Sequence, residues 1–385
     1  MNDEELIIRG LLFIVLCCSC NYFIDFREFF NSMYCEKLIY ENYRNIERAE
    51  ITLGEGVNVF IGNNAQGKTN AIEGVYYFAR GKSFRGAKDK ELIRLGQETA
   101  KAELFFSDNA RKRHHEIILN TSEKRLCKKE GVIIRRLSDF IGSFRAVLFS
   151  PEHLSMVKEG PSERRNFADI AISQLYPAYI AALSKYQKIL LQRNSVLKEP
   201  FSPVFYDTLS VLSEQLAAEA AVVAKFRAEY FSKLDTKVRD LIEDMTAGKE
   251  KVMLEYNDGK TREEYLACYT QNIEKETKAG TTLYGPHKDD VKITLNGGDA
   301  RVFASQGQQR SIALAMKLGE GEISRDESGE YPVFLLDDIL SELDDNRKEY
   351  VLRGLDGRQV LITTCERIPE GAKVFRVSGG TYEEV

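Results

Sequence analysis

The sequence predicts an α/β protein whose sheet-forming parts are separated by a long helical insertion. Three observations lead to this prediction. Apolar, β-prone runs fill residues 33–158 and return in residues 281–385. Between them, residues 159–280 are dominated by helix formers. A glycine-rich loop at residues 62–69 stands between a strand pattern and a helix pattern, which is the arrangement that a phosphate-binding loop requires.

The composition is that of an ordinary globular protein. A chain of 385 residues is long enough for about two or three domains. The formal net charge is −5, so a surface for nucleic acid must be a local patch or arise when chains associate. Four of the seven cysteines lie in the first 35 residues and the other three are isolated. No disulfide or metal-site spacing emerges, and a reducing cytoplasm is predicted.

Residues 1–32 differ from the rest of the chain. The apolar run at 6–18 is too short to cross a bilayer, and the acidic start is unlike a secretory signal. The cysteines at 17–20 leave metal binding or lipid attachment open. The simpler interpretation is an N-terminal extension outside the fold, with translation starting at Met33.

The first part of the fold reads as strands around one helix. Strands are predicted at residues 37–40, 46–53, 57–61, 100–106, 115–119, 131–134 and 146–149. A helix is predicted at 70–78, and a basic segment follows it. The candidates for contacts with a DNA backbone are Arg80, Lys82, Arg85, Arg164 and Arg165. A solvated charged surface is the alternative for each of them.

The glycine-rich loop has a specific chemistry. Its backbone N–H groups and the helix N-terminus can surround phosphates, Lys68 adds a full charge, and the Thr69 hydroxyl can bind Mg²⁺. The predicted nucleotide-binding residues are Gly62, Asn63, Asn64, Ala65, Gln66, Gly67, Lys68 and Thr69. The sequence therefore predicts binding of a nucleoside triphosphate.

The insertion carries apolar residues at helical spacing from 209 to 241. We expect this stripe to be the packing seam of a helical hairpin, and a surface for a partner is the alternative. The last part returns to strands at 291–295, 333–336 and 360–364, with a helix at 311–320. The strand at 333–336 ends in two acids, of which Asp337 can hold Mg²⁺ and Asp338 can act as the general base on water.

Two further segments resemble the ATP-binding-cassette superfamily. Residues 304–310 resemble its Leu-Ser-Gly-Gly-Gln signature: Ser305, Gly307 and Gln308 match, whereas Ala304 replaces the Leu and Gln306 replaces the first Gly. A Ser hydroxyl and N–H groups at a helix N-terminus form an anion site, although such a loop can also merely cap the next helix. Residues 341–344 resemble a D-loop, with Ser341 and Asp344 at its ends.

An ordered set of motifs resembles the bacterial RecF family from about residue 33 to the end. The motifs are Tyr43-Arg44-Asn45, residues 62–70, 160–165, 284–290, 305–310 and 335–344. The resemblance implies an ATPase head of the ATP-binding-cassette or SMC type with an inserted helical arm. The head would comprise residues 33–158 with the P-loop and 281–385 with the signature, Walker B and D-loop, and the arm would be 159–280.

The resemblance also implies a function. We expect a weak, DNA-dependent ATPase of recombinational repair and replication, with ATP and Mg²⁺ as cofactors, that works with RecR and RecO. It would form an ATP-dependent homodimer on gapped DNA and single-strand/double-strand junctions, and hydrolysis would release it. In such dimers Ser305 and Gly307 would face the partner's Lys68, and Arg44 would reach the nucleotide phosphates.

Three departures from the superfamily pattern predict slow hydrolysis. Residues 149–152 lack the usual Gln, and Asp338 stands where a Glu is usual. The switch His is replaced by the run at 363–365, where Thr364 is expected to contact a phosphate or water. Two other classes stay open: a transporter cassette, which would need the missing Gln and His, and an ATP-binding scaffold that never hydrolyses.

Overall fold

The computed structural model describes residues 32–199, 203–256, 259–365 and 371–385. The prediction about residues 1–32 therefore lies almost wholly outside the described residues. Met33 is buried, and its backbone N–H donates to the carbonyl of Tyr331 at 2.9 Å. No helix in the described ranges is both long enough and apolar enough to cross a membrane.

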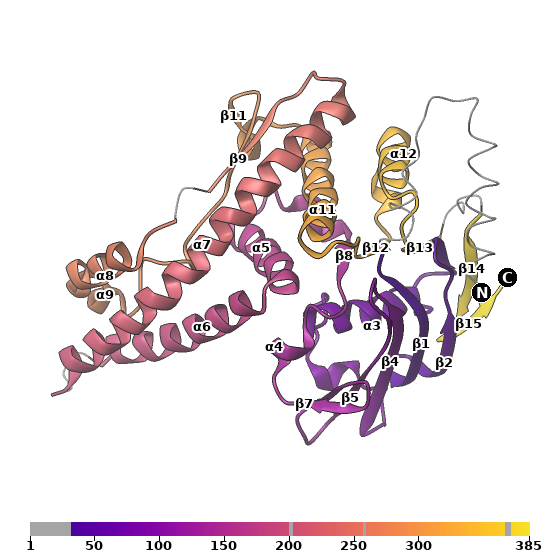
Figure 1. The fold of residues 1–385 in the computed structure, drawn as a ribbon, viewed down its shortest axis with the longest axis horizontal. Helices are drawn as coiled ribbons and strands as arrows, with labels where there is room; N and C mark the ends of the chain where they lie inside the picture. Colours follow the sequence, from indigo (N-terminus) through magenta and orange to yellow (C-terminus); the bar gives the residue numbers. More distant parts are fainter. Residues whose placement is uncertain (1–31, 200–202, 257–258, 366–370) are drawn as a thin grey trace. The chain divides into compact units, whose positions relative to one another are not determined.

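A mostly parallel six-stranded sheet carries the glycine-rich loop (Figure 1). Its order is β15 (Thr381–Glu384), β14 (Lys373–Ser378), β3 (Val57–Ile61), β13 (Val360–Thr364), β12 (Val333–Asp337) and β8 (Ala146–Phe149). Only the β14–β15 pair is antiparallel. The predicted bounds of β3, β8 and β13 are confirmed, whereas β14 and β15 were not predicted. The carboxyl ends of β3, β12 and β13 meet at one edge, where ligands of such sheets bind.

A second six-stranded sheet is antiparallel throughout. Its order is β2 (Ile46–Thr52), β1 (Tyr34–Tyr43), β4 (Thr99–Ser107), β5 (Lys112–Asn120), β6 (Leu126–Lys129) and β7 (Val132–Ile134). The strands predicted here are confirmed with bounds shifted by up to three residues, and β6 was not predicted. Two short helical turns, η1 (Asp89–Leu92) and α4 (Leu137–Phe140), connect parts of this region.

The helix α3 (Lys68–Arg80) lies between the two sheets. Its residues from Ala71 to Ala79 share one apolar core with both sheets. The helices α11 (Gln306–Ser328) and α12 (Asp345–Gly354) cover the other face of the parallel sheet. Since helices cover both faces, β12 and β13 are buried along their whole length, as their continuous apolar runs predict.

The insertion contains three long helices, α5 (Pro161–Leu175), α6 (Pro177–Leu197) and α7 (Phe205–Thr246). The α7 helix is 42 residues long and packs along α6 and α11. Most of its predicted apolar stripe is buried there, which confirms the helical seam. Two shorter helices follow, α8 (Arg262–Gln271) and α9 (Ile273–Ala279).

A small third sheet joins one strand of the insertion to two strands that follow residue 280, and of the three only the strand at 291–295 was predicted. Its order is β11 (Gly298–Asp299), β10 (Lys292–Leu295) and β9 (Val252–Glu255), all antiparallel. The four residues of β9 are too few for a strand pattern to stand out from their helical surroundings. Because β9 and β10 pair, the proposed arm boundary at residue 280 passes through a shared sheet. The short helix α10 (Ala300–Phe303) then leads into α11.

Candidate nucleotide-binding site

The glycine-rich loop connects β3 to α3, and close packing fixes its shape. A Cβ atom on Gly62 would lie 2.3 Å from the carbonyl oxygen of Val377 in β14, so only glycine fits there. Gly67 has φ +114°, a conformation that glycine adopts without strain. The hairpin of β14 and β15 holds Gln66 from behind, because the N–H groups of Gly379 and Gly380 donate to its side chain and carbonyl at 2.8 and 2.9 Å.

Lys68 folds over this loop. Its Nζ donates to the carbonyl of Gly62 and, at 3.2 Å, to the carbonyl of Asn63. The same nitrogen lies 2.9 Å from Sγ of Cys365. The side chain is 7% exposed, so its charge is held inside the loop that would surround a phosphate. Carbonyl acceptors are exchanged readily for anionic oxygens, which make stronger hydrogen bonds to an ammonium group. Cys365, which follows Thr364 at the end of β13, was not among the predicted site residues.

The two predicted metal-binding residues lie together. The Thr69 hydroxyl donates to Oδ1 of Asp337 at 2.9 Å, and the Thr363 hydroxyl donates to the same oxygen at 2.8 Å. Burial raises the pKa of Asp337, while these two hydroxyls oppose the shift; the charge of Asp338 raises the pKa and that of Arg85 lowers it. A hydroxyl beside a carboxylate at a strand end is a hard-oxygen donor pair that fits Mg²⁺.

Asp338, the predicted general base, directly follows the last residue of β12. It is exposed and has φ +50°, a left-handed conformation that Asp tolerates better than most residues. Its N–H donates to the Thr363 hydroxyl at 3.0 Å, and its carbonyl accepts from the Ser341 hydroxyl at 2.8 Å. Thr363 thus orients both acids, whereas the predicted residue was its neighbour Thr364; both are buried. Only the parallel pairing of β12 and β13 reveals this role.

Arg44 lies near the loop but is bound to a carboxylate. Its guanidinium forms a two-point ion pair with Glu73 of α3, at 2.9 and 2.7 Å. Glu73 is fully buried and also accepts from the Ser83 hydroxyl. The guanidinium of Arg85 reaches Asn70 at 3.4 Å, and its charge lowers the pKa of Asp337. Arg85, predicted as a DNA contact, therefore lies beside the nucleotide-binding site.

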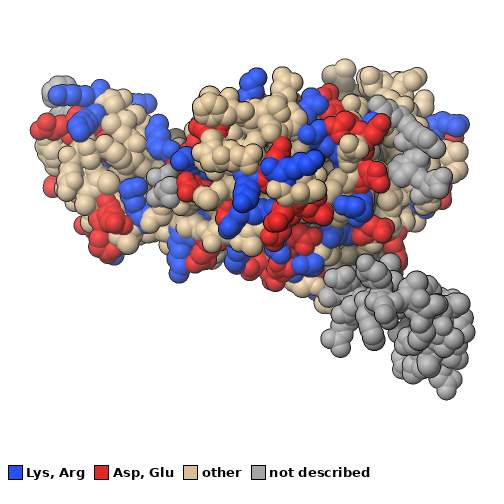
Figure 2. Space-filling view, turned by 90° about the horizontal axis from the view of Figure 1, so that it is seen from above, with Lys and Arg blue, Asp and Glu red and all other residues tan. Residues whose placement is uncertain are grey.

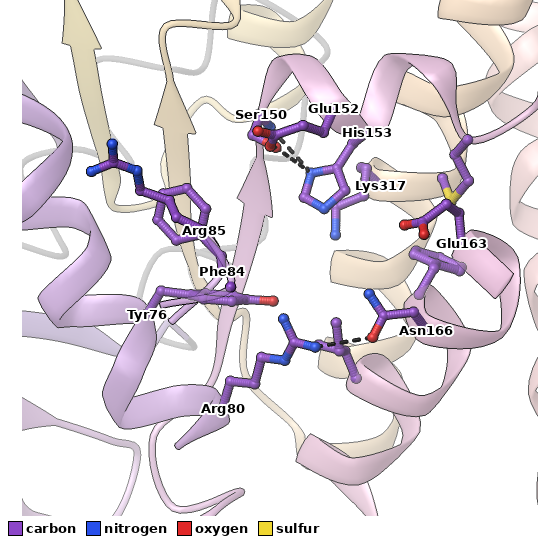
Figure 3. A pocket seen from close by; sticks show the side chains of 14 residues that line it. Tyr76, Arg80, Phe84, Arg85, Ser150, Glu152, His153, Glu163, Asn166 and Lys317 are labelled. Carbon is purple, nitrogen blue, oxygen red and sulfur yellow. Dashed lines mark hydrogen bonds between the residues drawn. The ribbon is translucent and has the colours of Figure 1, made fainter. Parts of the chain in front are cut away.

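The remaining DNA candidates have different surroundings. Arg80 borders a cavity of about 350 Å³ and donates to Asn166 of α5 at 2.9 Å (Figure 3). Lys82 is exposed, and Arg165 donates to the carbonyl of Asp289 at 2.7 Å. Figure 2 shows basic and acidic side chains interspersed over the face seen from above, with no field of one sign.

Arg164 is not on the surface. It is 4% exposed, pairs with both carboxylate oxygens of Asp290 at 2.8 and 2.9 Å, and donates to three backbone carbonyls. The expectation of a DNA contact is therefore wrong for this residue, because its guanidinium joins the motif at 160–165 to the motif at 284–290. A charge pattern could not reveal this, since the partner lies 126 residues away.

The signature segment forms the N-terminus of α11. The Ser305 hydroxyl accepts from the N–H of Gln308 at 3.3 Å, and the Gln308 side chain accepts from the N–H of Ser305 at 2.8 Å. The helix thus begins at Gln306, five residues before its predicted start. Among the described residues, no hydrogen bond or ion pair joins residues 305–308 to residues 62–69. In the D-loop, Asp344 caps α12 by accepting from a backbone N–H at 3.0 Å.

Comparisons with known proteins agree on one family. Residues 34–374 match the model of the RecF/RecN/SMC N-terminal domain. The chain is 39% identical over 361 residues to the DNA replication and repair protein RecF of Clostridium beijerinckii, covering 90% of this chain and 98% of that protein.

Solved structures extend the comparison. A structure described as the recombination mediator protein RecF with ATPrS in the RecFOR pathway superposes with a TM-score of 0.87. That protein is 34% identical, and the match covers 92% of this chain and 99% of that chain. An Smc head domain of Pyrococcus furiosus, at 14% identity and a TM-score of 0.55, covers 92% of this chain and 96% of that chain and shares the fold. This chain therefore has the SMC-type ATPase head fold and belongs to the RecF family.

Proposed function

We propose that this chain is an ATP-dependent DNA-binding protein of recombinational repair and replication. One observation carries the proposal. Lys68, Thr69 and Asp337 lie together at one site, whereas the signature helix that should complete the site has no hydrogen bond or ion pair to residues 62–69 among the described residues. A second copy of the chain would supply the missing signature, so that two nucleotides are enclosed in one symmetric dimer.

The roles of the residues follow from their positions. Lys68 binds the phosphates of ATP, and Thr69 and Asp337 hold Mg²⁺, which neutralises charge that develops during phosphoryl transfer. Asp338 orients and deprotonates the attacking water. The side chain of Asp338 is one methylene shorter than that of the usual Glu, which favours slow hydrolysis. Slow hydrolysis suits a switch that releases the dimer.

The names of the relatives support DNA as the target. RecF relatives are called DNA replication and repair proteins, and a solved relative is assigned to the RecFOR pathway. We propose that the ATP-bound dimer binds gapped DNA and single-strand/double-strand junctions in the cytoplasm and works with RecR and RecO. Arg80 and Lys82 remain candidates for contacts with the DNA backbone.

Sedimentation of the full chain tests this proposal. We expect monomers without nucleotide and with ADP, and dimers with ATP that gapped DNA stabilises. Asp338→Asn should bind ATP, form the dimer and keep it, because release requires hydrolysis. An unchanged mass in ATP, with ATP binding demonstrated, would overturn the proposal.

The alternative classes predict other results. A transporter cassette is not favoured, since the relatives are RecF proteins. A scaffold that never hydrolyses would release equal phosphate from wild type and from Asp338→Asn, so phosphate release separates it from a switch.

A further inference from the structure

Two arginines cross between the signature helix and the D-loop. Arg347, on the first turn of α12, reaches α11, where its Nη2 donates to the carbonyl of Gly307 at 2.8 Å and its Nε donates to the Ser311 hydroxyl at 2.9 Å. Arg310, on α11, extends toward the D-loop and donates to the backbone carbonyl of Glu342. It also donates to the Glu342 carboxylate at 3.2 Å.

Arg347 is also fixed at its own end. Its Nη1 contacts a carboxylate oxygen of Asp344, and its backbone N–H donates to the other oxygen at 3.0 Å. One guanidinium therefore joins the last residue of the D-loop to the signature glycine. A planar guanidinium with five fixed donors can serve three acceptors at once, which an ammonium group on a flexible chain does not reproduce.

The D-loop is connected at its other end to the acids of the nucleotide-binding site. The Ser341 hydroxyl donates to the carbonyl of Asp338 at 2.8 Å, and the N–H of Asp338 donates to the Thr363 hydroxyl, which also binds Asp337. Hydrogen bonds thus link Asp337 to Ser341 at the start of the D-loop, and the D-loop backbone leads on to Asp344. From there Arg347 reaches the N-terminus of α11. All of these residues belong to one chain.

We propose that Arg347, assisted by Arg310, is a positioning residue. It fixes the position of the signature segment, and that position depends on whether the chain's own nucleotide-binding site holds ATP. The inference rests on the proposed ATP-driven dimer and deepens it. In that dimer the signature of each chain serves the nucleotide of the other. A shift at Asp337 and Asp338 in one site would therefore be passed through Arg347 to the second site, which couples the two sites.

The test compares three variants of the full chain. Arg347→Ala removes all three side-chain hydrogen bonds, and Arg347→Lys keeps the positive charge but lacks the planar guanidinium with its several N–H donors. Arg353→Ala is the matched control, because Arg353 lies on the same helix and makes a surface ion pair with Asp244 at 3.5 Å. Each variant is measured for ATP affinity as a dilute monomer, for dimerisation with ATP, for melting temperature and for ATP turnover against protein concentration.

If Arg347 has a positioning role, dimerisation should weaken in the variant while ATP affinity and melting temperature stay close to those of wild type. Arg347→Ala should bind ATP within about twofold of wild type, since no hydrogen bond or ion pair between described residues joins Arg347 to the P-loop. It should dimerise about tenfold or more weakly. Turnover should need at least a roughly tenfold higher protein concentration and then approach the wild-type maximum. Arg347→Lys should recover only part of the loss, and Arg353→Ala should change nothing by more than about twofold.

Other outcomes overturn the inference in distinguishable ways. If Arg347→Ala dimerises like wild type, or if Arg347→Lys restores dimerisation fully, the link through the guanidinium is refuted. If ATP affinity and melting temperature fall together with dimerisation, Arg347 merely supports the fold. If wild type itself does not dimerise with ATP, the proposed function fails, whatever the variants do.

Discussion

Thr363→Val probes the residue that orients both acids of the nucleotide-binding site. Valine keeps the shape of threonine and its place in β13, where position 363 is 1% exposed. It removes the hydroxyl that donates to Asp337 at 2.8 Å and accepts from the N–H of Asp338 at 3.0 Å. Among the described residues, Thr69 would be the one hydroxyl donor left to Asp337, and the N–H of Asp338 would lose the Thr363 hydroxyl.

The magnitude follows from these two bonds. A hydrogen bond to a charged group contributes about 1.5–3 kcal/mol, and an unpaired backbone N–H costs about 1–3 kcal/mol. Because a buried methyl group returns part of the loss, we expect Thr363→Val to lower the free energy of unfolding by about 2–4 kcal/mol. The hydroxyl opposes the rise in the pKa of Asp337, so that pKa should rise further in the variant.

Urea unfolding with and without Mg²⁺ and ATP measures both effects. The variant should lose stability alone and gain less from the ligands than wild type does. The difference between variant and wild type in stabilisation by Mg²⁺ and ATP should widen as the pH falls toward the raised pKa of Asp337, because the protonated carboxyl does not bind Mg²⁺. Thr270→Val on α8, whose exposed hydroxyl donates to the carbonyl of Leu266 at 2.9 Å, is the control. A loss below about 0.5 kcal/mol with normal ligand stabilisation would refute the reasoning.

Three further predictions concern other parts of the fold. Burial lowers the pKa of His115 to about 3, so the free energy of unfolding should fall as the pH drops below 6.5, by about 2 kcal/mol at pH 5. In urea unfolding His115→Phe should lose less free energy over the same pH range, and an equal loss would contradict the pKa shift. Arg193→Met leaves the buried carboxylate of Glu276 without its cation at 2.7 Å and should cost about 3–5 kcal/mol of unfolding free energy, which Glu276→Leu should largely restore. Gly62→Ala should weaken ATP binding by at least about tenfold in a binding titration, since the new Cβ meets the β14 backbone, whereas Gly56→Ala has open space and should not.

The sequence predicted local structure better than distant pairing. β3, β8 and β13 were placed to the residue, because each is a short apolar run ended by turn or polar residues. β9, β14 and β15 were missed, since short strands take their stability from partners far along the chain. The pairing of β14 with β3 crosses more than 300 residues, a relation that local pattern does not encode.

The candidate site shows the same division. Lys68, Thr69 and Asp337 were predicted and lie together, because a P-loop and an acidic strand end have strong local signatures. Thr363, Cys365 and Arg347 were missed, since their roles depend on side chains that only the folded sheet brings near.

A mixing experiment tests most directly whether each site is built from two chains. Lys68→Ala disables the P-loop but keeps the signature, and Ser305→Arg blocks the signature but keeps the P-loop. We expect neither variant to hydrolyse ATP alone. In an equal mixture half of the dimers pair the two variants and hold one intact site, so turnover should recover to roughly a quarter of the wild-type value per chain. A mixture that stays as inactive as its components, with both variants folded and Ser305→Arg binding ATP, would contradict the shared site.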